Sequence, residues 1–104
     1  MAIIPDDNTL DRMESILNIA SDFTRLKILY CILGEQKSVN QIAEETGASQ
    51  SLVSHQLSIL KKNHLVSATR NGHNVFYQLD DEHVEQLLEI TFDHVNEEWN
   101  DGRN

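Results

Sequence analysis

Two short stretches of helical periodicity, separated by a glycine, constrain the fold of this chain more than any other feature of its sequence. Ser38 is a good cap for a first helix, and Gly47 stands where such a helix would end. Ser49 can cap a second helix directly afterwards. The apolar stripe of this second helix consists of Leu52, Val53, Leu57 and Leu60. The arrangement predicts a helix-turn-helix over about residues 38–63.

The residues after the second helix change from a helical to a strand-like pattern. Residues 65–70 and 75–79 are rich in β-branched and aromatic side chains, and Asn71-Gly72 lies between them. Asn-Gly between two such runs is a strong signal for a tight hairpin turn. A helix-turn-helix followed by a hairpin is a winged helix, with the wing over about residues 65–79.

Helical periodicity also precedes this unit. Asn8 can cap an N-terminal helix, and Asp22 or Thr24 can cap a second one that ends near Gly34. The apolar positions of the N-terminal helix are Leu10, Met13, Ile16, Leu17 and Ala20. Their spacing is typical of an amphipathic helix.

A long helix is expected to close the chain, over about residues 81–99, with Asp80 or Asp81 as its cap. Its apolar positions are Val84, Leu87, Leu88, Ile90, Phe92 and Val95. They spread over a wider arc than one small domain needs to cover. A partner helix would cover the excess, so we expect a homodimer through the N- and C-terminal helices. The predicted fold is mainly α with one β-hairpin, in a single winged-helix domain over residues 1–104.

Composition restricts the classes of protein to which the chain can belong. No apolar run approaches the ~20 residues that span a bilayer, so no membrane partner is expected. The N-terminus runs directly into Asp6 and Asp7, which does not resemble a secretory signal. Cys31 is the single cysteine and lies on an apolar helix, where core packing is its simplest role. A cytoplasmic location fits these features.

The net charge of −9 argues, taken alone, against a nucleic-acid partner, because phosphate contacts need Lys and Arg. The charge is unevenly distributed, however. Residues 36–76 hold two acidic and four basic residues, giving +2, whereas residues 77–104 hold nine acidic residues and one arginine, giving −8. Acidic surfaces also serve solubility. The sequence therefore allows one mildly basic face on an acidic body.

Four polar residues are expected on the exposed side of the second helix near its N-terminus: Gln50, Ser51, Ser54 and His55. That end of a recognition helix faces base edges, and Gln and Ser can contact bases or phosphates. Candidate contacts to the DNA backbone are Lys61, Lys62, Arg70 and His73. Each residue alone is ordinary for a polar surface. As a set on a winged helix they predict an interface with double-stranded DNA.

Two runs carry a family resemblance: SLVSHQLSIL at residues 51–60, continuing into HLV at 64–66, and RNGHNVFY at residues 70–77. Both closely resemble the ArsR/SmtB family of bacterial metal-responsive repressors, and the similarity covers about residues 10–98. The resemblance implies a homodimeric winged-helix repressor that blocks transcription until an inducer releases it. It also implies that the last helix pairs with its symmetry mate.

The last helix carries four potential metal ligands, Asp81, His83, His94 and Glu97. At about 100° per residue, His83, His94 and Glu97 share one stripe of the helix. His83 and His94 nevertheless lie about 16 Å apart along the axis, so one helix cannot surround a single ion with all four groups. An antiparallel pair of helices removes the difficulty. Asp81 and His83 of one subunit then meet His94 and Glu97 of the other, which gives two equivalent sites per dimer.

This ligand pattern is similar to the interhelical zinc site of the zinc-sensing members of the family. Two imidazoles and two carboxylates suit Zn²⁺, with Co²⁺ as a mimic, and the absence of thiolates argues against Cu(I) and Cd²⁺. Affinity order alone does not exclude Ni²⁺ or Cu²⁺. The alternative is an acidic dimer helix with two incidental histidines.

The combined expectation is a zinc-responsive repressor whose metal-free dimer binds a palindromic operator and whose DNA affinity falls when zinc binds. By resemblance, a backbone carbonyl near His64 would couple the metal-bound His94 to the recognition helix. The derepressed genes would serve metal efflux or sequestration. No enzyme is expected, because four ligands leave a zinc no open position and no His-Glu-x-x-His pattern occurs, and no small-molecule substrate is expected either. Two alternatives remain: a repressor of this type answering cobalt, nickel or a non-metal signal, and a metal-binding protein-interaction module.

Overall fold

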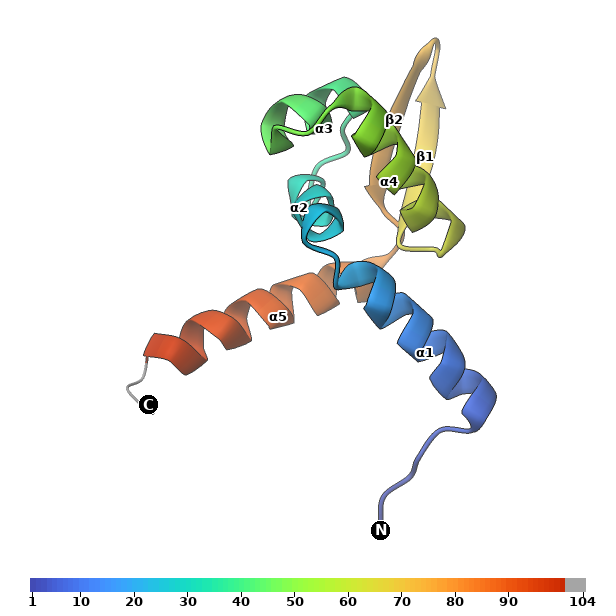
Figure 1. Ribbon diagram of the computed structural model, residues 1–104, viewed down its shortest axis with the longest axis vertical. Coiled ribbons are helices and arrows are strands. Elements are labelled where there is room, and N and C mark those ends of the chain that lie inside the picture. Colours follow the sequence, from blue (N-terminus) through green and yellow to red (C-terminus); the bar gives the residue numbers. More distant parts are fainter. Residues whose placement is uncertain (101–104) are drawn as a thin grey trace.

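The computed structural model describes residues 1–100 and confirms a winged helix-turn-helix, with five helices and one hairpin in that part of the chain. Figure 1 shows the order of the elements along the chain. The elements are α1 (Asp7–Ala20), α2 (Phe23–Cys31), α3 (Val39–Thr46), α4 (Gln50–Lys62), β1 (Val66–Asn71), β2 (Asn74–Leu79) and α5 (Glu82–Asn100). Within residues 1–100, no helix is both long and apolar enough to cross a membrane.

The core lies where α2, α3, α4 and the hairpin meet, and α1 and α5 project away from it in different directions (Figure 1). Its buried apolar residues are Ala20, Ile28, Leu29, Ile32, Ile42, Ala43, Val53, Leu57, Leu60, Leu65, Val66, Val84 and Leu88. The molecule is accordingly extended, measuring 53 × 38 × 21 Å. A compact head thus carries two helices that contact it at one end.

The caps of the helix-turn-helix are the predicted ones. Ser38 and Gln41 form a capping box at the start of α3, where the Ser38 side chain accepts from the Gln41 amide and the Gln41 side chain accepts from the Ser38 amide. Gly47 ends α3 in the left-handed region, with φ of 78°. The Ser49 hydroxyl then accepts from the Leu52 amide at 3.1 Å and begins α4.

The bounds of the first two helices differ from the predicted ones. Asp6, not Asn8, caps α1, because its carboxylate accepts the Thr9 amide at 2.8 Å. Asp22 caps α2 as predicted. This helix ends at Cys31, three residues before Gly34, because the chain turns there to lead into α3.

The hairpin turn is displaced by one residue from the predicted Asn71-Gly72. Asn71 pairs with Asn74, so the two-residue loop is Gly72-His73. Gly72 has φ of 67° and His73 does not have a positive φ, which is the pattern of a turn with glycine at its first central position. The wing is also tied to the head, because Lys37 and Tyr77 exchange two backbone hydrogen bonds of 3.0 and 2.7 Å.

Helix α4 ends in a Schellman motif built around a histidine. The Leu65 amide donates to the Leu60 carbonyl at 2.9 Å, and the His64 amide donates to the Lys61 carbonyl at 3.1 Å. His64 therefore occupies the left-handed position, with φ of 61°, where glycine is usual. It is the only non-glycine residue with positive φ in the part of the chain that the structure describes.

Much of the apolar surface of α1 and α5 is exposed, as the expected dimer through these helices requires. Of the apolar stripe of α1 only Ala20 is buried, and Leu17 is 53% exposed. On α5, Val84 and Leu88 are buried while Ile90 is 66% exposed. Leu52 was predicted to anchor α4 and is 40% exposed instead, because it lies at the side of the helix rather than against the core. The long helices thus offer apolar surface that the chain itself does not cover.

The backbone at His64 yields a stability prediction. His64→Val is expected to lower the free energy of unfolding by about 1–2 kcal/mol, because a β-branched residue fits the left-handed region poorly. His64→Gly is expected to stay within about 1 kcal/mol of the wild type, since glycine adopts this conformation freely. Urea denaturation of the metal-free protein at one fixed concentration measures both. Equal stability of the two variants would contradict the strained geometry.

Candidate DNA-binding and metal-binding sites

The polar face of α4 is exposed as predicted. Its residues Gln50, Ser51, Ser54 and His55 are all on the surface, near the helix N-terminus. The opposite face is held by Val53, Leu57 and Leu60, each fully buried. The N-terminal half of α4 therefore presents polar side chains from a helix that is fixed in the core, as a recognition helix must.

A side-chain link that sequence reasoning missed also fixes α4. Arg25 on α2 donates to the side chain of Gln56 at 2.9 Å and to the Ile19 carbonyl of α1 at 2.7 Å. This one guanidinium joins three helices. Gln56 belongs to the Ser-His-Gln-Leu run that carries the family resemblance. Its place in that run was the sequence signal that could have singled it out.

The predicted backbone-contacting cations Lys61, Lys62, Arg70 and His73 are also exposed. His73 lies in the hairpin turn itself, at the tip of the wing (Figure 1). The structure brings none of them into an ion pair within residues 1–97. Their charges are therefore not used by ion pairs among those residues.

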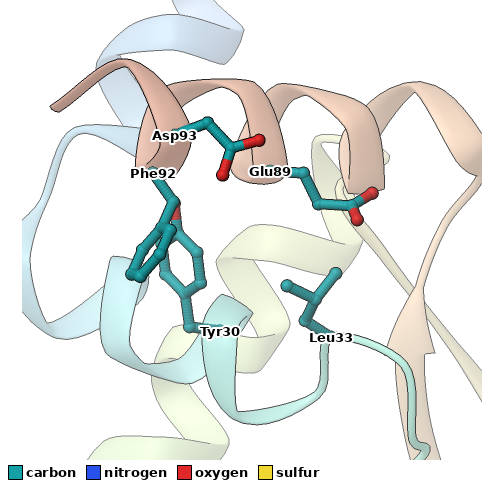
Figure 2. A pocket seen from close by; sticks show the side chains of 5 residues that line it. All are labelled: Tyr30, Leu33, Glu89, Phe92 and Asp93. Atoms are coloured by element: carbon teal, nitrogen blue, oxygen red, sulfur yellow. The ribbon is translucent and has the colours of Figure 1, made fainter. Parts of the chain in front are cut away.

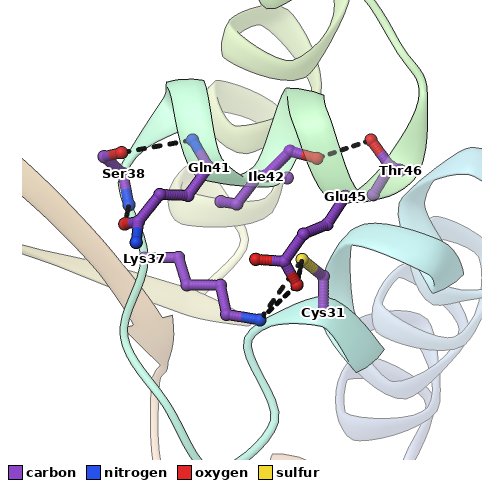
Figure 3. A network of polar contacts seen from close by, with 7 residues as sticks. All are labelled: Cys31, Lys37, Ser38, Gln41, Ile42, Glu45 and Thr46. Carbon is purple, nitrogen blue, oxygen red and sulfur yellow. Dashed lines mark hydrogen bonds and ion pairs between the residues drawn. The ribbon is translucent and has the colours of Figure 1, made fainter.

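The basic residue that precedes the helix-turn-helix is used internally. Figure 3 shows Lys37 beside Glu45 of α3, with the amine nitrogen 2.7 Å from the carboxylate oxygen, and the Lys37 side chain is only 13% exposed. This hydrogen bond lowers the pKa of the Glu45 carboxyl and raises that of the Lys37 amine. The pair removes one charge of each sign, so residues 36–76 keep a net charge of +2 but offer DNA three cationic side chains rather than four.

Cys31 borders the same ion pair and is only partly a core residue. It is half-buried, and its thiol lies 3.7 Å from Glu45 Oε1 and 3.8 Å from Lys37 Nζ (Figure 3). Burial raises the pKa of the Cys31 thiol and so lowers the fraction of reactive thiolate. Core packing, the role predicted from its apolar neighbours, therefore describes Cys31 only in part. The sequence did not indicate its polar contacts, because Lys37 and Glu45 lie further along the chain.

The first two predicted metal ligands come together at the start of α5. Asp81 caps the helix, with Oδ1 accepting from the Val84 amide at 3.1 Å, and its Oδ2 lies 3.7 Å from His83 Nδ1. His94 and Glu97 are exposed three turns further along. Within the described residues, no three His, Cys, Asp or Glu side chains gather to hold an ion. One chain therefore assembles half of the proposed ligand set.

The ligand stripe of α5 also carries apolar residues that the chain leaves uncovered. Relative to His83, Leu87 lies at about +40° around the helix and Ile90 at about −20°, between the two histidines. The buried Val84 and Leu88 lie at about +100° and +140°. The face with the ligands is therefore separate from the face that packs on the head.

A cavity of about 290 Å³ lies on the other side of α5, beside α2. Figure 2 shows that Tyr30 and Leu33 line it from below and that Glu89, Phe92 and Asp93 line it from α5. The Tyr30 hydroxyl donates to the Leu88 carbonyl at 2.7 Å, and the Tyr30 and Phe92 rings lie 6.4 Å apart. These contacts hold α5 on the head without using any proposed ligand.

The capped helix pair, the wing and the polar face of α4 define a winged helix-turn-helix DNA-binding protein. A family model described as bacterial regulatory protein, arsR family, matches residues 22–68. The transcriptional repressor SmtB homolog of Synechocystis is 34% identical over 96 residues, which cover 89% of this chain and 73% of that protein. The chain belongs to the ArsR family of bacterial transcriptional regulators.

Two further comparisons agree with this membership. The HTH-type transcriptional regulator KmtR of Mycobacterium tuberculosis is 35% identical over 85 residues, and the match spans 82% of this chain and 65% of that protein's length. A homodimeric winged helix-turn-helix DNA-binding domain from Mycobacterium bovis superposes with a TM-score of 0.86 at 26% identity, covering 100% of this chain and 98% of that one. The relatives are transcriptional regulators, which agrees with the expectation that the chain is not an enzyme.

The exposed wing yields a prediction for DNA binding. Arg70→Gln is expected to weaken binding to a duplex carrying the protein's own promoter and to reduce the slope of log K against log[salt] by about 2, one phosphate contact in each subunit of a dimer. Fluorescence anisotropy at several salt concentrations measures the slope. Glu89→Gln is the control, because Glu89 is an exposed charged residue of α5, outside the helix-turn-helix and the wing. An unchanged slope in Arg70→Gln would show that Arg70 makes no phosphate contact and would contradict a DNA contact by the wing.

Proposed function

We propose that the chain is a zinc-responsive transcriptional repressor that acts in the cytoplasm as a homodimer. Without metal the dimer binds a palindromic operator through Gln50, Ser51, Ser54 and His55 of both recognition helices. Zinc binding between the two α5 helices lowers the DNA affinity and derepresses genes for metal efflux or sequestration. The class of regulator rests on family membership, and the signal rests on the residues of α5.

The convergence of Asp81 and His83 at the first turn of α5 carries this proposal. The side chains of residues two apart diverge on a regular helix, but Asp81 is a cap and its second oxygen turns toward His83 at 3.7 Å. The cap thus supplies one oxygen and one nitrogen donor in the same small volume. His94 and Glu97, exposed on the same stripe, supply a second such pair.

The apolar part of the stripe supports an antiparallel helix pair with the same register. If His83 lies opposite His94 of the partner subunit, Leu87 lies opposite Ile90 of the partner subunit, because both pairs of numbers have the same sum. Exposed apolar side chains then cover one another at the centre of the pair, and the donors meet at its two ends. One register therefore satisfies both requirements.

The donor set fits a divalent zinc ion. Zn²⁺ takes four nitrogen and oxygen ligands in a tetrahedral arrangement, and when bound it would tie the two α5 helices together at each end. Asp81, His83, His94 and Glu97 would hold it, two from each subunit. The half-buried Cys31 lies on α2 and supplies no thiolate to the proposed site on α5. Soft metals prefer thiolate ligands, so the proposed donor set does not favour them.

The proposed effect on DNA follows from linkage between the two ligands. Metal must lower operator affinity by the same factor by which operator lowers metal affinity. His64 lies directly after α4, and its backbone carbonyl is the proposed acceptor for the second ring nitrogen of a metal-bound His94. Such a contact would connect the metal site to the recognition helix through the rigid Schellman turn.

The proposal predicts a metal-dependent change in operator affinity. Excess Zn²⁺ is expected to weaken binding of the promoter duplex by about tenfold or more, since allosteric couplings are typically 1–3 kcal/mol. His94→Ala and Glu97→Gln are expected to lose most of this response. Glu89→Gln is the matched control, an exposed glutamate on the same helix outside the stripe. Anisotropy titrations with a chelator or with excess metal measure the ratio.

Three outcomes distinguish the alternatives. If excess Zn²⁺ leaves the operator affinity of the wild type unchanged while Co²⁺ or Ni²⁺ lowers it, the signal is cobalt or nickel rather than zinc. No response to any of these ions would leave a repressor that answers another signal. No salt-dependent binding to the promoter would favour a protein-interaction module.

A response that weakens as the pH falls toward 6 would support imidazole ligands, because protons compete with metal for the ring nitrogens.

A further inference from the structure

A second pocket, whose lining includes none of the proposed metal ligands, collects basic side chains. It has a volume of about 260 Å³ and lies between α1 and the end of α4. Its lining residues are Arg12, Ser15, Ile16, Lys62, Asn63 and His64. The left-handed turn at His64 bends the chain at this point. No carboxylate lines the pocket, although the chain carries 17 acidic residues against eight lysines and arginines.

The two permanent cations of this pocket, Arg12 and Lys62, have no partner among the residues that the structure describes. Elsewhere, Arg25 and Lys37 are held by hydrogen bonds, and Lys27 lies over the Phe23 ring. In the part of the chain that the structure describes, neither Arg12 nor Lys62 makes an ion pair or a side-chain hydrogen bond. Two such cations in the lining of one pocket, in an otherwise acidic protein, indicate an anionic occupant.

The C-terminal end of α5 has a charge imbalance of the opposite sign, with acidic side chains and no basic residue in its last turn. Glu97 is exposed in that turn, and Asp93 is exposed one turn before it. Acidic side chains at this end are unfavourable, because the helix dipole already places negative charge there. A cationic surface against the end of α5 would offset this cost. The same chain offers none, because α5 projects away from α1 (Figure 1).

We propose that the pocket of Arg12 and Lys62 holds the acidic C-terminal end of α5 from the partner subunit. The inference rests on the antiparallel α5 pair of the proposed function, which brings the end of one α5 beside the start of the other. The start of α5 lies near the head, next to the C-terminal end of α1 (Figure 1). The pocket therefore acts as an electrostatic socket that fixes the register of the dimer in the absence of metal.

A DNA phosphate is the other anion that this pocket could receive. Its position disfavours that occupant, because the pocket lies between the middle of α1 and the end of α4, whereas the hairpin turn is at the far tip of the wing (Figure 1). Lys62, a candidate phosphate contact on the surface, then serves the dimer rather than the DNA. The DNA-reading residues Gln50 to His55 lie at the N-terminus of α4, whereas the pocket lies beyond its C-terminus. A phosphate contact would thus be remote from the base-reading end of the helix.

Dimer dissociation of the full chain, measured by sedimentation equilibrium in chelator without DNA, tests the proposal. Arg12→Glu is expected to raise the dissociation constant by about tenfold at low salt, since two symmetric sites each lose an attraction and gain a repulsion. The effect should shrink at high salt. Lys61→Glu is the matched control, because Lys61 neighbours Lys62 but does not line the pocket. Equal dissociation constants for Arg12→Glu and the wild type would overturn the proposal.

Zero-length carbodiimide cross-linking of the wild type keeps the test independent of whether any variant folds. In dimers mixed from ¹⁵N-labelled and unlabelled chains, Lys62 is expected to couple to a carboxylate of α5 from residue 93 onward in the other chain. Couplings only within one chain, or none, would overturn the proposal, as would an Arg12→Glu variant that loses operator affinity without weaker dimers. If the cross-link forms but Zn²⁺ leaves operator affinity unchanged, the proposed zinc response is contradicted, whereas the proposed dimer contact at the pocket is supported.

Discussion

The constraint on which the rest of this structure depends is that α5 must satisfy two partners at once. Val84 and Leu88 bury one face of the helix on the head, while Ile90 on another face is 66% exposed. Burying apolar surface is the main favourable term in association, so this second face favours a symmetry mate. The proposed metal donors stand on that same face, so a metal bound there would act directly on the dimer contact.

Rigid links within the head connect the DNA-reading surface to this helix. Arg25 joins α1, α2 and α4 through two hydrogen bonds, and the Lys37 backbone joins the wing to the start of α3. The turn at His64 then ends α4 beside α1. A displacement of α5 against its mate would therefore be passed to α4 by packed elements rather than by a flexible linker.

Charge in this protein is separated by function. The acidic surplus lies mainly on α5, where it would favour the proposed divalent cation and the proposed contact with the basic pocket around Arg12. The cations left for DNA are few, because Lys37 is paired with Glu45 inside the head. Such a surface gives weak non-specific attraction to DNA, so discrimination depends more on the recognition helix.

The sequence by itself determined the winged helix, because Ser38, Gly47 and Ser49 act through local hydrogen bonds and backbone preferences that neighbouring residues decide. It also indicated which residues of α5 are candidate metal donors, since helical spacing follows from local geometry. Only the tertiary structure decided which apolar residues stay exposed, where Lys37 finds its partner and that Arg12 meets the end of α4. Those facts depend on contacts between distant segments, which periodicity does not encode.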